Sequence, residues 1–291
     1  MARIAIIGGG SMGEAVLSGL LRAGRQVKDL VVAERLPDRA RYLAETYSVL
    51  VTSPTAAAEN ATFVIIAVKP SDVESVVGEI ARAAADAEDG GAEQVYISVA
   101  AGVTTGYLES KLPAGTPVVR AMPNAPALVG AGVTALAKGR FATPEQVKEV
   151  SALFDSVGGV LSVPEAQMDA VTAVSGSGPA YFFLMVEALI DAAVGAGLSR
   201  RVATDLVAQT MAGSAAMLLE RMEQDRGSTG AAAPDLSADT TAARLRATVT
   251  SPGGTTAAAL RELERLGLRA AVDEAVRAAT ARSQELRITS E

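Results

Sequence analysis

Residues 3–13, RIAIIGGGSMG, join a run of β-branched residues to a cluster of glycines. The run RIAII predicts a buried strand, and the apolar spacing over 12–23 predicts a helix directly after it. Gly8, Gly10 and Gly13 fit the pattern GxGxxG in this strand-to-helix connection, where glycines allow a tight turn and let a pyrophosphate approach the helix start. The stretch therefore indicates a dinucleotide-binding sheet; a glycine turn without a ligand is the alternative.

The rest of the first half alternates short strands with helical patterns such as 72–84. This alternation predicts an α/β domain with a parallel sheet and crossover helices. The predicted strands are 3–7, 30–33, 63–68, 95–100 and 117–122.

After Glu165 the pattern changes to long helices, so we predict two domains, a Rossmann-type domain over 1–164 and an all-helical domain over 165–291. The helix over 179–196 is apolar nearly all round, which predicts a subunit interface or a helical core. The segments 83–93 and 225–239 are poor in large apolar residues and are predicted to be mobile. The predicted helices of the second domain are 179–196, 199–223, 255–265 and 268–286.

Composition limits the possible partners and locations. The 291 residues carry a net charge of -7 without a basic cluster, which argues against a nucleic-acid partner. The longest apolar stretch contains Glu187 and Asp191 near its middle, so we expect no membrane helix. The apolar run at the N-terminus is too short for a signal peptide, and we therefore expect a cytoplasmic protein.

The missing residue types limit the chemistry. The sequence has no histidine and no cysteine, which excludes histidine acid–base catalysis, a thiol nucleophile and ordinary zinc sites, and we expect no metal. The last lysine is Lys148, so arginine is the only cationic side chain beyond it. Chemistry in the second half must use hydroxyls, carboxylates, backbone groups or a reactive cofactor.

The residues that follow the second predicted strand give conflicting signals about the dinucleotide. Glu34 closes that strand at the position where an acidic side chain binds the ribose hydroxyls of NADH. Arg35 and Arg39 could instead meet the extra phosphate of NADPH.

Three further segments contain candidate ligand-binding residues. AVKP (67–70) and RAMPNAP (120–126) end predicted strands, and ligands bind at the carboxyl ends of strands in open α/β sheets. SGSGPAYFF (175–183) opens the long apolar helix. Each segment taken alone is also compatible with a simple turn or helix start.

The stretch TSPGGTTAAAL (250–260) places hydroxyl residues, a proline and two glycines before an alanine-rich helical run. Backbone N–H groups in the first helical turn have no partner within the helix, so this stretch indicates an anion-binding cradle. A capped helix start without a ligand is the alternative.

The ordered set GGGSMG, AVKP, RAMPNAP, SGSGPAY and TSPGGTT closely resembles the pyrroline-5-carboxylate reductase family over essentially the whole chain. The resemblance implies reduction of 1-pyrroline-5-carboxylate to L-proline by NADPH, with NADH possible. It also implies a helical domain that interlocks with a second subunit in a homodimer, and often a decamer built from five dimers. Glu34 is a departure from the family pattern, and it conflicts with the family's frequent preference for NADPH.

The resemblance also assigns the site residues. The anion becomes the substrate carboxylate, and Thr256 becomes the catalytic residue that hydrogen-bonds the ring nitrogen. The substrate-binding residues are Ser251, Gly253, Gly254, Thr255 and Thr256. The cofactor-binding residues are Gly8, Gly10, Ser11, Met12, Gly13, Glu34, Arg35, Asn60, Ala67, Val68, Lys69, Pro70, Met122, Pro123 and Asn124.

Three other interpretations have some support in the sequence. A β-hydroxyacid dehydrogenase shares the GxGxxG start. A resemblance to that family would imply a lysine in the helical domain, and this chain has no lysine there. A short-chain dehydrogenase is suggested by YLESK, in which Tyr107 and Lys111 fit YxxxK; we interpret this segment as an exposed helix. A non-enzymatic dinucleotide sensor would retain GGGSMG but gives no reason for TSPGGTT.

Overall fold

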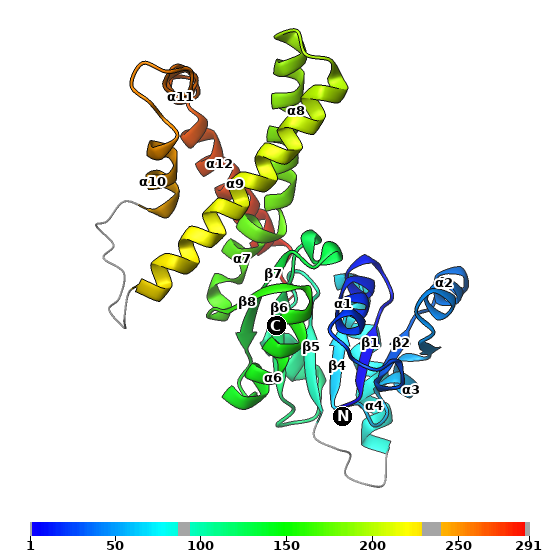
Figure 1. The fold of residues 1–291 in the computed structure, drawn as a ribbon. Coiled ribbons are helices and arrows are strands. Elements are labelled where there is room, and N and C mark those ends of the chain that lie inside the picture. The colour runs from blue at the N-terminus through cyan, green and yellow to red at the C-terminus, as the bar shows by residue number, and fades with distance from the viewer. Residues whose placement is uncertain (1, 87–93, 229–239, 289–291) are drawn as a thin grey trace. The chain divides into compact units, whose positions relative to one another are not determined.

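The structure is a computed structural model in which residues 2–86, 94–228 and 240–288 are described. The chain divides into two compact units, one made of Met1–Pro179 with Val276–Glu291 and the other of Ala180–Ala275. The first unit is an α/β structure and the second is made of helices (Figure 1). The predicted fold class, a Rossmann-type sheet followed by a helical region, is thus confirmed.

One sheet forms the centre of the first unit. Its strands are β1 (Ile4–Ile7), β2 (Leu30–Ala33), β3 (Leu50–Thr52), β4 (Phe63–Ile66), β5 (Val95–Ser98), β6 (Val118–Met122), β7 (Gly132–Lys138) and β8 (Gly158–Ser162). Their order in space is β3-β2-β1-β4-β5-β6-β7-β8. The first six strands are parallel and have the order of a dinucleotide-binding sheet. In this order the chain adds strands on one side of β1 up to β3 and then on the other side from β4 onward, so the strand order reverses between β1 and β4.

Five of the eight described strands agree with the sequence prediction. The short edge strand β3 and the strands β7 and β8 are missing from it. β7 also pairs antiparallel with β6, and β8 pairs parallel with β7. The predicted parallel sheet is therefore present, and the pair of β6 and β7 makes the whole sheet a mixed one.

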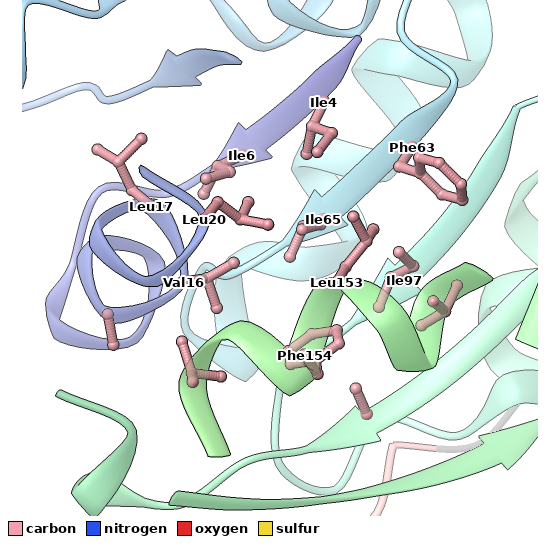
Figure 2. Packing of buried hydrophobic residues seen from close by; sticks show 14 of the residues in the cluster. Ile4, Ile6, Val16, Leu17, Leu20, Phe63, Ile65, Ile97, Leu153 and Phe154 are labelled. Carbon is pink, nitrogen blue, oxygen red and sulfur yellow. The ribbon is translucent and has the colours of Figure 1, made fainter. Parts of the chain in front are cut away.

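Helices cover both faces of the sheet because successive side chains of each strand point to opposite faces. Ile4 and Ile6 pack on one face with side chains of α1 and α6, as Figure 2 shows, while Ala5 and Ile7 belong to the buried cluster on the other. A fully buried side chain of this size contributes about 1.5–3 kcal/mol. The α-helices of this unit are α1 (Ser11–Arg22), α2 (Pro37–Tyr47), α3 (Pro54–Ala58), α4 (Pro70–Asp86), α5 (Thr105–Lys111), α6 (Pro144–Phe154) and α7 (Met168–Val171).

The YLESK segment forms part of helix α5, as predicted, but the helix is not simply exposed. Tyr107 is 6% exposed and Leu108 is fully buried, because both pack into the second core cluster. Lys111 points outward and donates a hydrogen bond of 2.7 Å to Glu74. The YxxxK spacing thus gives one buried tyrosine and one surface ion pair.

Four of the remaining helices match the predicted ranges closely. They are α8 (Gly178–Gly195), α9 (Arg200–Ser228), α10 (Thr241–Thr248), α11 (Thr255–Arg265) and α12 (Leu268–Glu285). The sequence analysis does not predict α10. Helices α4 and α9 continue into the two segments predicted to be mobile, and the parts of those segments over 87–93 and 229–239 lie outside the described residues.

The second unit exposes much apolar surface. Phe182, Phe183 and Leu184 of α8 are 65%, 62% and 67% exposed. By length and composition alone, the helical stretches Glu165–Gly195 and Arg200–Asp225 could cross a membrane. Asp191, which lies in the first stretch, accepts a hydrogen bond of 2.8 Å from Arg200 in the second.

Candidate functional site

The connection from β1 to α1 has the shape that a dinucleotide requires. Gly8 has a φ of 109° and its N–H donates to the carbonyl oxygen of Ala33 at 2.8 Å. A Cβ on Gly13 would lie 2.0 Å from the Gly8 oxygen, so only glycine allows the helix to pack this closely. A Cβ on Gly10 would meet no atom within 4 Å. Gly10, the N-cap of α1, thus leaves open space where a pyrophosphate would approach the helix start.

Glu34 and Arg39 hold the middle of the glycine loop. The Gly9 N–H donates to Glu34 Oε2 at 3.0 Å, and Arg39 Nε donates to the Gly9 oxygen at 2.7 Å. The other Glu34 oxygen accepts from the Leu36 N–H at 2.9 Å. Both polar groups of Gly9 therefore have partners on the segment that follows β2.

Glu14 of α1 completes this network. It accepts hydrogen bonds from Arg39, from the Tyr47 hydroxyl at 2.7 Å and from the Tyr42 hydroxyl at 3.1 Å. Burial alone would raise the pKa of Glu14, but these hydrogen bonds and the charge of Arg39 outweigh it and lower the pKa. Burial and the bond to Glu14 raise the pKa of Tyr47 to about 12. Glu14 is thus an ionised partner for Arg39 at neutral pH.

AVKP begins directly after β4, and RAMPNAP begins within β6 and continues past its end. β1, β4 and β6 have the same direction, so their carboxyl ends lie at one edge of the sheet. The Ala67 N–H donates to the Ile7 oxygen at 2.7 Å, which fixes the start of AVKP beside the glycine loop. AVKP therefore flanks the point between β1 and β4 where the strand order reverses, the expected ligand position, and RAMPNAP lies two strands further along the same edge.

Asn124 connects RAMPNAP to SGSGP. Its Oδ1 accepts from the Val133 N–H at 2.9 Å, and its Nδ2 donates to the Ser175 oxygen at 3.4 Å. A Cβ on Gly176 would come within 2.9 Å of Met122 Cε, so this glycine allows the two motifs to touch. Residues Thr172–Gly176 form a π-helical turn, which often marks a functional site. The Ser175 hydroxyl is buried and has no hydrogen-bond partner among the described residues.

Two predicted cofactor residues have other surroundings. Asn60 is exposed and precedes β4, so it lies at the amino edge of the sheet, opposite the glycine loop. The fold therefore does not support Asn60 as a cofactor residue. The Arg35 side chain is 76% exposed and lies 3.3 Å from Asp72.

The TSPGGTT stretch belongs to the second unit and forms a turn that leads into α11. Gly253 has a φ of 67°, a left-handed conformation that favours glycine, and the Gly254 N–H donates to the Ser251 oxygen at 3.1 Å. The Gly254 amide thus has a partner within the turn. Gly254 is the N-cap residue of α11 and makes no side-chain cap hydrogen bond. The backbone amides of Thr255 and Thr256, in the first turn, therefore have no acceptor from a capping side chain.

Sequence reasoning missed the long-range contacts of the first unit. The guanidinium of Arg39 binds Gly9 and Glu14, although its position predicted a phosphate partner. Arg120, which begins RAMPNAP, is buried and lies 3.4 Å from Glu165, which also accepts from the Thr105 N–H at 2.7 Å. No local pattern points to these pairs, because their members are far apart in the chain.

The sheet order, the glycine loop and Glu34 beside it define a protein of the Rossmann-type dinucleotide-binding class. The family model NADP oxidoreductase coenzyme F420-dependent matches residues 3–102, and the model Pyrroline-5-carboxylate reductase dimerisation matches residues 165–286. The chain is 76% identical over 291 residues to the pyrroline-5-carboxylate reductases of Mycobacterium tuberculosis and Mycobacterium leprae, covering 100% of this chain and 99% of each relative. This chain belongs to the pyrroline-5-carboxylate reductase family.

Solved structures agree with this assignment. A pyrroline-5-carboxylate reductase from Coxiella burnetii superposes with a TM-score of 0.86 at 35% identity, covering 99% of both chains. A Plasmodium falciparum pyrroline carboxylate reductase with NADP bound gives 0.78 at 29% identity, covering 98% of both. The likeness extends over both units of the chain.

Proposed function

We propose that this chain reduces 1-pyrroline-5-carboxylate to L-proline with a nicotinamide cofactor, the last step of proline biosynthesis. The observation that carries the proposal is the 76% identity over the full length to pyrroline-5-carboxylate reductases. The chain is accordingly an oxidoreductase that uses NAD(P)H. A cytoplasmic location belongs to the same proposal.

The residues of the first unit fit the cofactor. The open space at Gly10 admits a pyrophosphate, and the N-terminus of α1 favours its negative charge. When bound, the nicotinamide supplies the hydride that the imine carbon accepts. We propose the predicted cofactor residues other than Asn60, and their support is that they end or follow β1, β2, β4 and β6 or open α1.

The TSPGGTT stretch carries the proposed substrate contacts. The amides of Thr255 and Thr256, at the positive end of α11, hold the carboxylate without any lysine. Ser251 and Gly253 shape the turn, and Gly254 fixes it through its bond to the Ser251 oxygen. Thr256 is half-buried, and its hydroxyl is the proposed partner of the ring nitrogen.

This arrangement suits an imine better than a carbonyl. A protonated imine already carries a positive charge. When its carbon accepts hydride, the π electron pair of the C=N bond moves onto the nitrogen and gives a neutral amine, so no strong acid from the protein is needed. Reduction of a carbonyl needs a proton donor for the forming alkoxide. A chain without histidine, and without lysine beyond Lys148, is consistent with imine reduction.

The second unit supports a homo-oligomer. Its exposed apolar side chains exceed what a monomer normally shows to water, and the dimerisation family model covers them. We propose a homodimer in which α8 is covered by the partner subunit, and a decamer of five such dimers. In this proposal the domains are 1–164 and 165–291, the second being the dimerisation domain.

A direct assay tests the proposed reaction. Purified full-length protein is mixed with 1-pyrroline-5-carboxylate and either NADH or NADPH, and both cofactor oxidation and proline formation are measured. The proposal predicts that one molecule of proline forms for each molecule of NADH or NADPH that is oxidised. Folded protein that forms no proline with either cofactor would overturn it.

A further inference from the structure

Glu34 is held in place at the edge of the glycine loop. It directly follows β2, and its two oxygens accept from the N–H groups of Gly9 and Leu36 at 3.0 and 2.9 Å. A Cβ on Gly9 would lie 3.2 Å from Glu34 Oε2, so carboxylate and loop are in close contact. Moving this carboxylate away would leave the buried Gly9 amide without its partner.

We infer that Glu34 selects NADH over NADPH in this chain, an inference that rests on the proposed function and replaces the NADPH preference implied by the family resemblance. A carboxylate has about four acceptor sites, and the two backbone amides use two of them. The remaining sites can accept from ribose hydroxyls, which are donors. A 2′-phosphate has no donor when fully ionised, and its charge of about −1.5 to −2 at pH 7 is repelled by the fixed carboxylate.

Arg39 does not offset this repulsion. Its Nε donates to the Gly9 oxygen at 2.7 Å, and its guanidinium forms an ion pair with Glu14, whose side chain is 18% exposed. A phosphate that recruited Arg39 would have to break both contacts and leave Glu14 with only its tyrosine partners. We therefore assign Arg39 a positioning role in the loop.

Arg35 is the remaining cation that directly follows β2. Its side chain is 76% exposed, and the nearby Asp72 at 3.3 Å already compensates part of its charge. An exposed charge is solvated and screened by salt, so a contact from Arg35 to a phosphate is weaker than the same contact would be at a buried site. The fixed carboxylate of Glu34 therefore outweighs Arg35 in the choice of cofactor.

Equilibrium binding tests the inference without turnover. The Kd values of NADH and NADPH are measured by fluorescence titration of the wild-type protein and of Glu34→Ser, Glu34→Gln and Glu45→Gln. Glu45 is exposed on α2 and makes no described contact, so its variant controls for the loss of one negative charge. Urea unfolding checks that each variant is folded.

We expect the wild type to bind NADH more tightly than NADPH. Glu34→Ser should shift the ratio of the two Kd values toward NADPH by about tenfold or more, the scale of a lost hydrogen bond to a charged group. Glu34→Gln should shift it in the same direction, and Glu45→Gln should leave it unchanged. A wild type that prefers NADPH, or an equal shift in Glu45→Gln, would overturn the inference.

The outcome is separable from that of the proposed reaction. Proline formation with a preference for NADPH would retain the reaction and reject the role of Glu34. Preferential NADH binding without proline formation with either cofactor would retain the role of Glu34 and reject the proposed reaction.

Discussion

Asp169 and Arg287 form an ion pair that joins helix α7 to the residues just after α12. Arg287 Nε donates to Asp169 Oδ2 at 2.7 Å, and the Ser283 hydroxyl donates to Asp169 Oδ1 at 2.7 Å. The Asp169 side chain is 3% exposed. A little further on, Ile288 pairs with Val103, so this terminal segment is fixed to the first unit by both side-chain and backbone bonds.

The first prediction is that Asp169→Ala destabilises the protein. The substitution leaves Arg287 and Ser283 without their acceptor, which costs about 3 kcal/mol for a pair buried on one side. Urea unfolding followed by circular dichroism measures the change. Asp155→Ala, at an exposed position, is the control and should change the free energy of unfolding by less than about 0.5 kcal/mol. Equal effects of the two substitutions would show that the pair does not stabilise the fold.

The second prediction concerns acid stability. Burial alone would raise the pKa of Asp169, but the hydrogen bonds from Arg287 and Ser283 and nearby positive charge outweigh it and lower the pKa. The stabilisation is therefore present above the unfolded pKa of about 3.9 and is lost as the pH falls through the lower, folded value. Asp169→Asn should lose less stability than the wild type between about pH 5 and pH 2. Unfolding curves over this range that fall in parallel would contradict the assignment.

How much the sequence could predict depended on the range of the interactions. RIAII and FVIIAV are β-branched runs, so their strands are visible locally, whereas Gly132–Lys138 mixes glycine and alanine with its apolar residues and forms a strand only through its neighbours. The glycine motif is local too. The partners of Arg39 and Asp169 lie 25 to 118 residues away, and no spacing rule reveals such pairs. The prediction of Asn60 as a cofactor residue has no support from the fold, because its place in the sequence does not show which edge of the sheet it reaches.

The third prediction separates two glycines of one motif. Gly10→Val should fold normally, because a Cβ there meets no protein atom, but it fills the space that the pyrophosphate needs. NAD(P)H affinity should fall by about tenfold or more, that is by at least about 1.4 kcal/mol. Gly13→Val should instead lower stability, since its Cβ would overlap the Gly8 oxygen. Fluorescence titration and thermal unfolding of both variants check this, and unchanged affinity in folded Gly10→Val would remove this glycine from the cofactor site.

The fourth prediction tests the subunit interface. Leu184 of α8 is 67% exposed, and a charge placed there would be buried in the proposed dimer without a partner. Leu184→Glu should therefore dissociate the wild-type oligomer at micromolar concentration, as measured by light scattering. Leu50→Glu, at an equally apolar and 60% exposed position on β3, should leave the oligomer intact. A monomeric wild type would contradict the proposal at once.

The last prediction concerns Thr256. If its hydroxyl bonds to the ring nitrogen, Thr256→Val keeps the shape of the first turn of α11 but removes that bond. A bond made mainly in the transition state should lower kcat and kcat/KM together, by roughly ten- to a thousandfold for about 1.5–4 kcal/mol. NAD(P)H affinity should not change, because the proposed cofactor residues lie in the first unit. Thr248→Val, on exposed α10, removes a hydroxyl whose partner among the described residues is the Arg244 oxygen, and this variant should retain wild-type kinetics. Steady-state kinetics with 1-pyrroline-5-carboxylate decide the matter, and a wild-type kcat in Thr256→Val would show that this hydroxyl takes no part in the reaction.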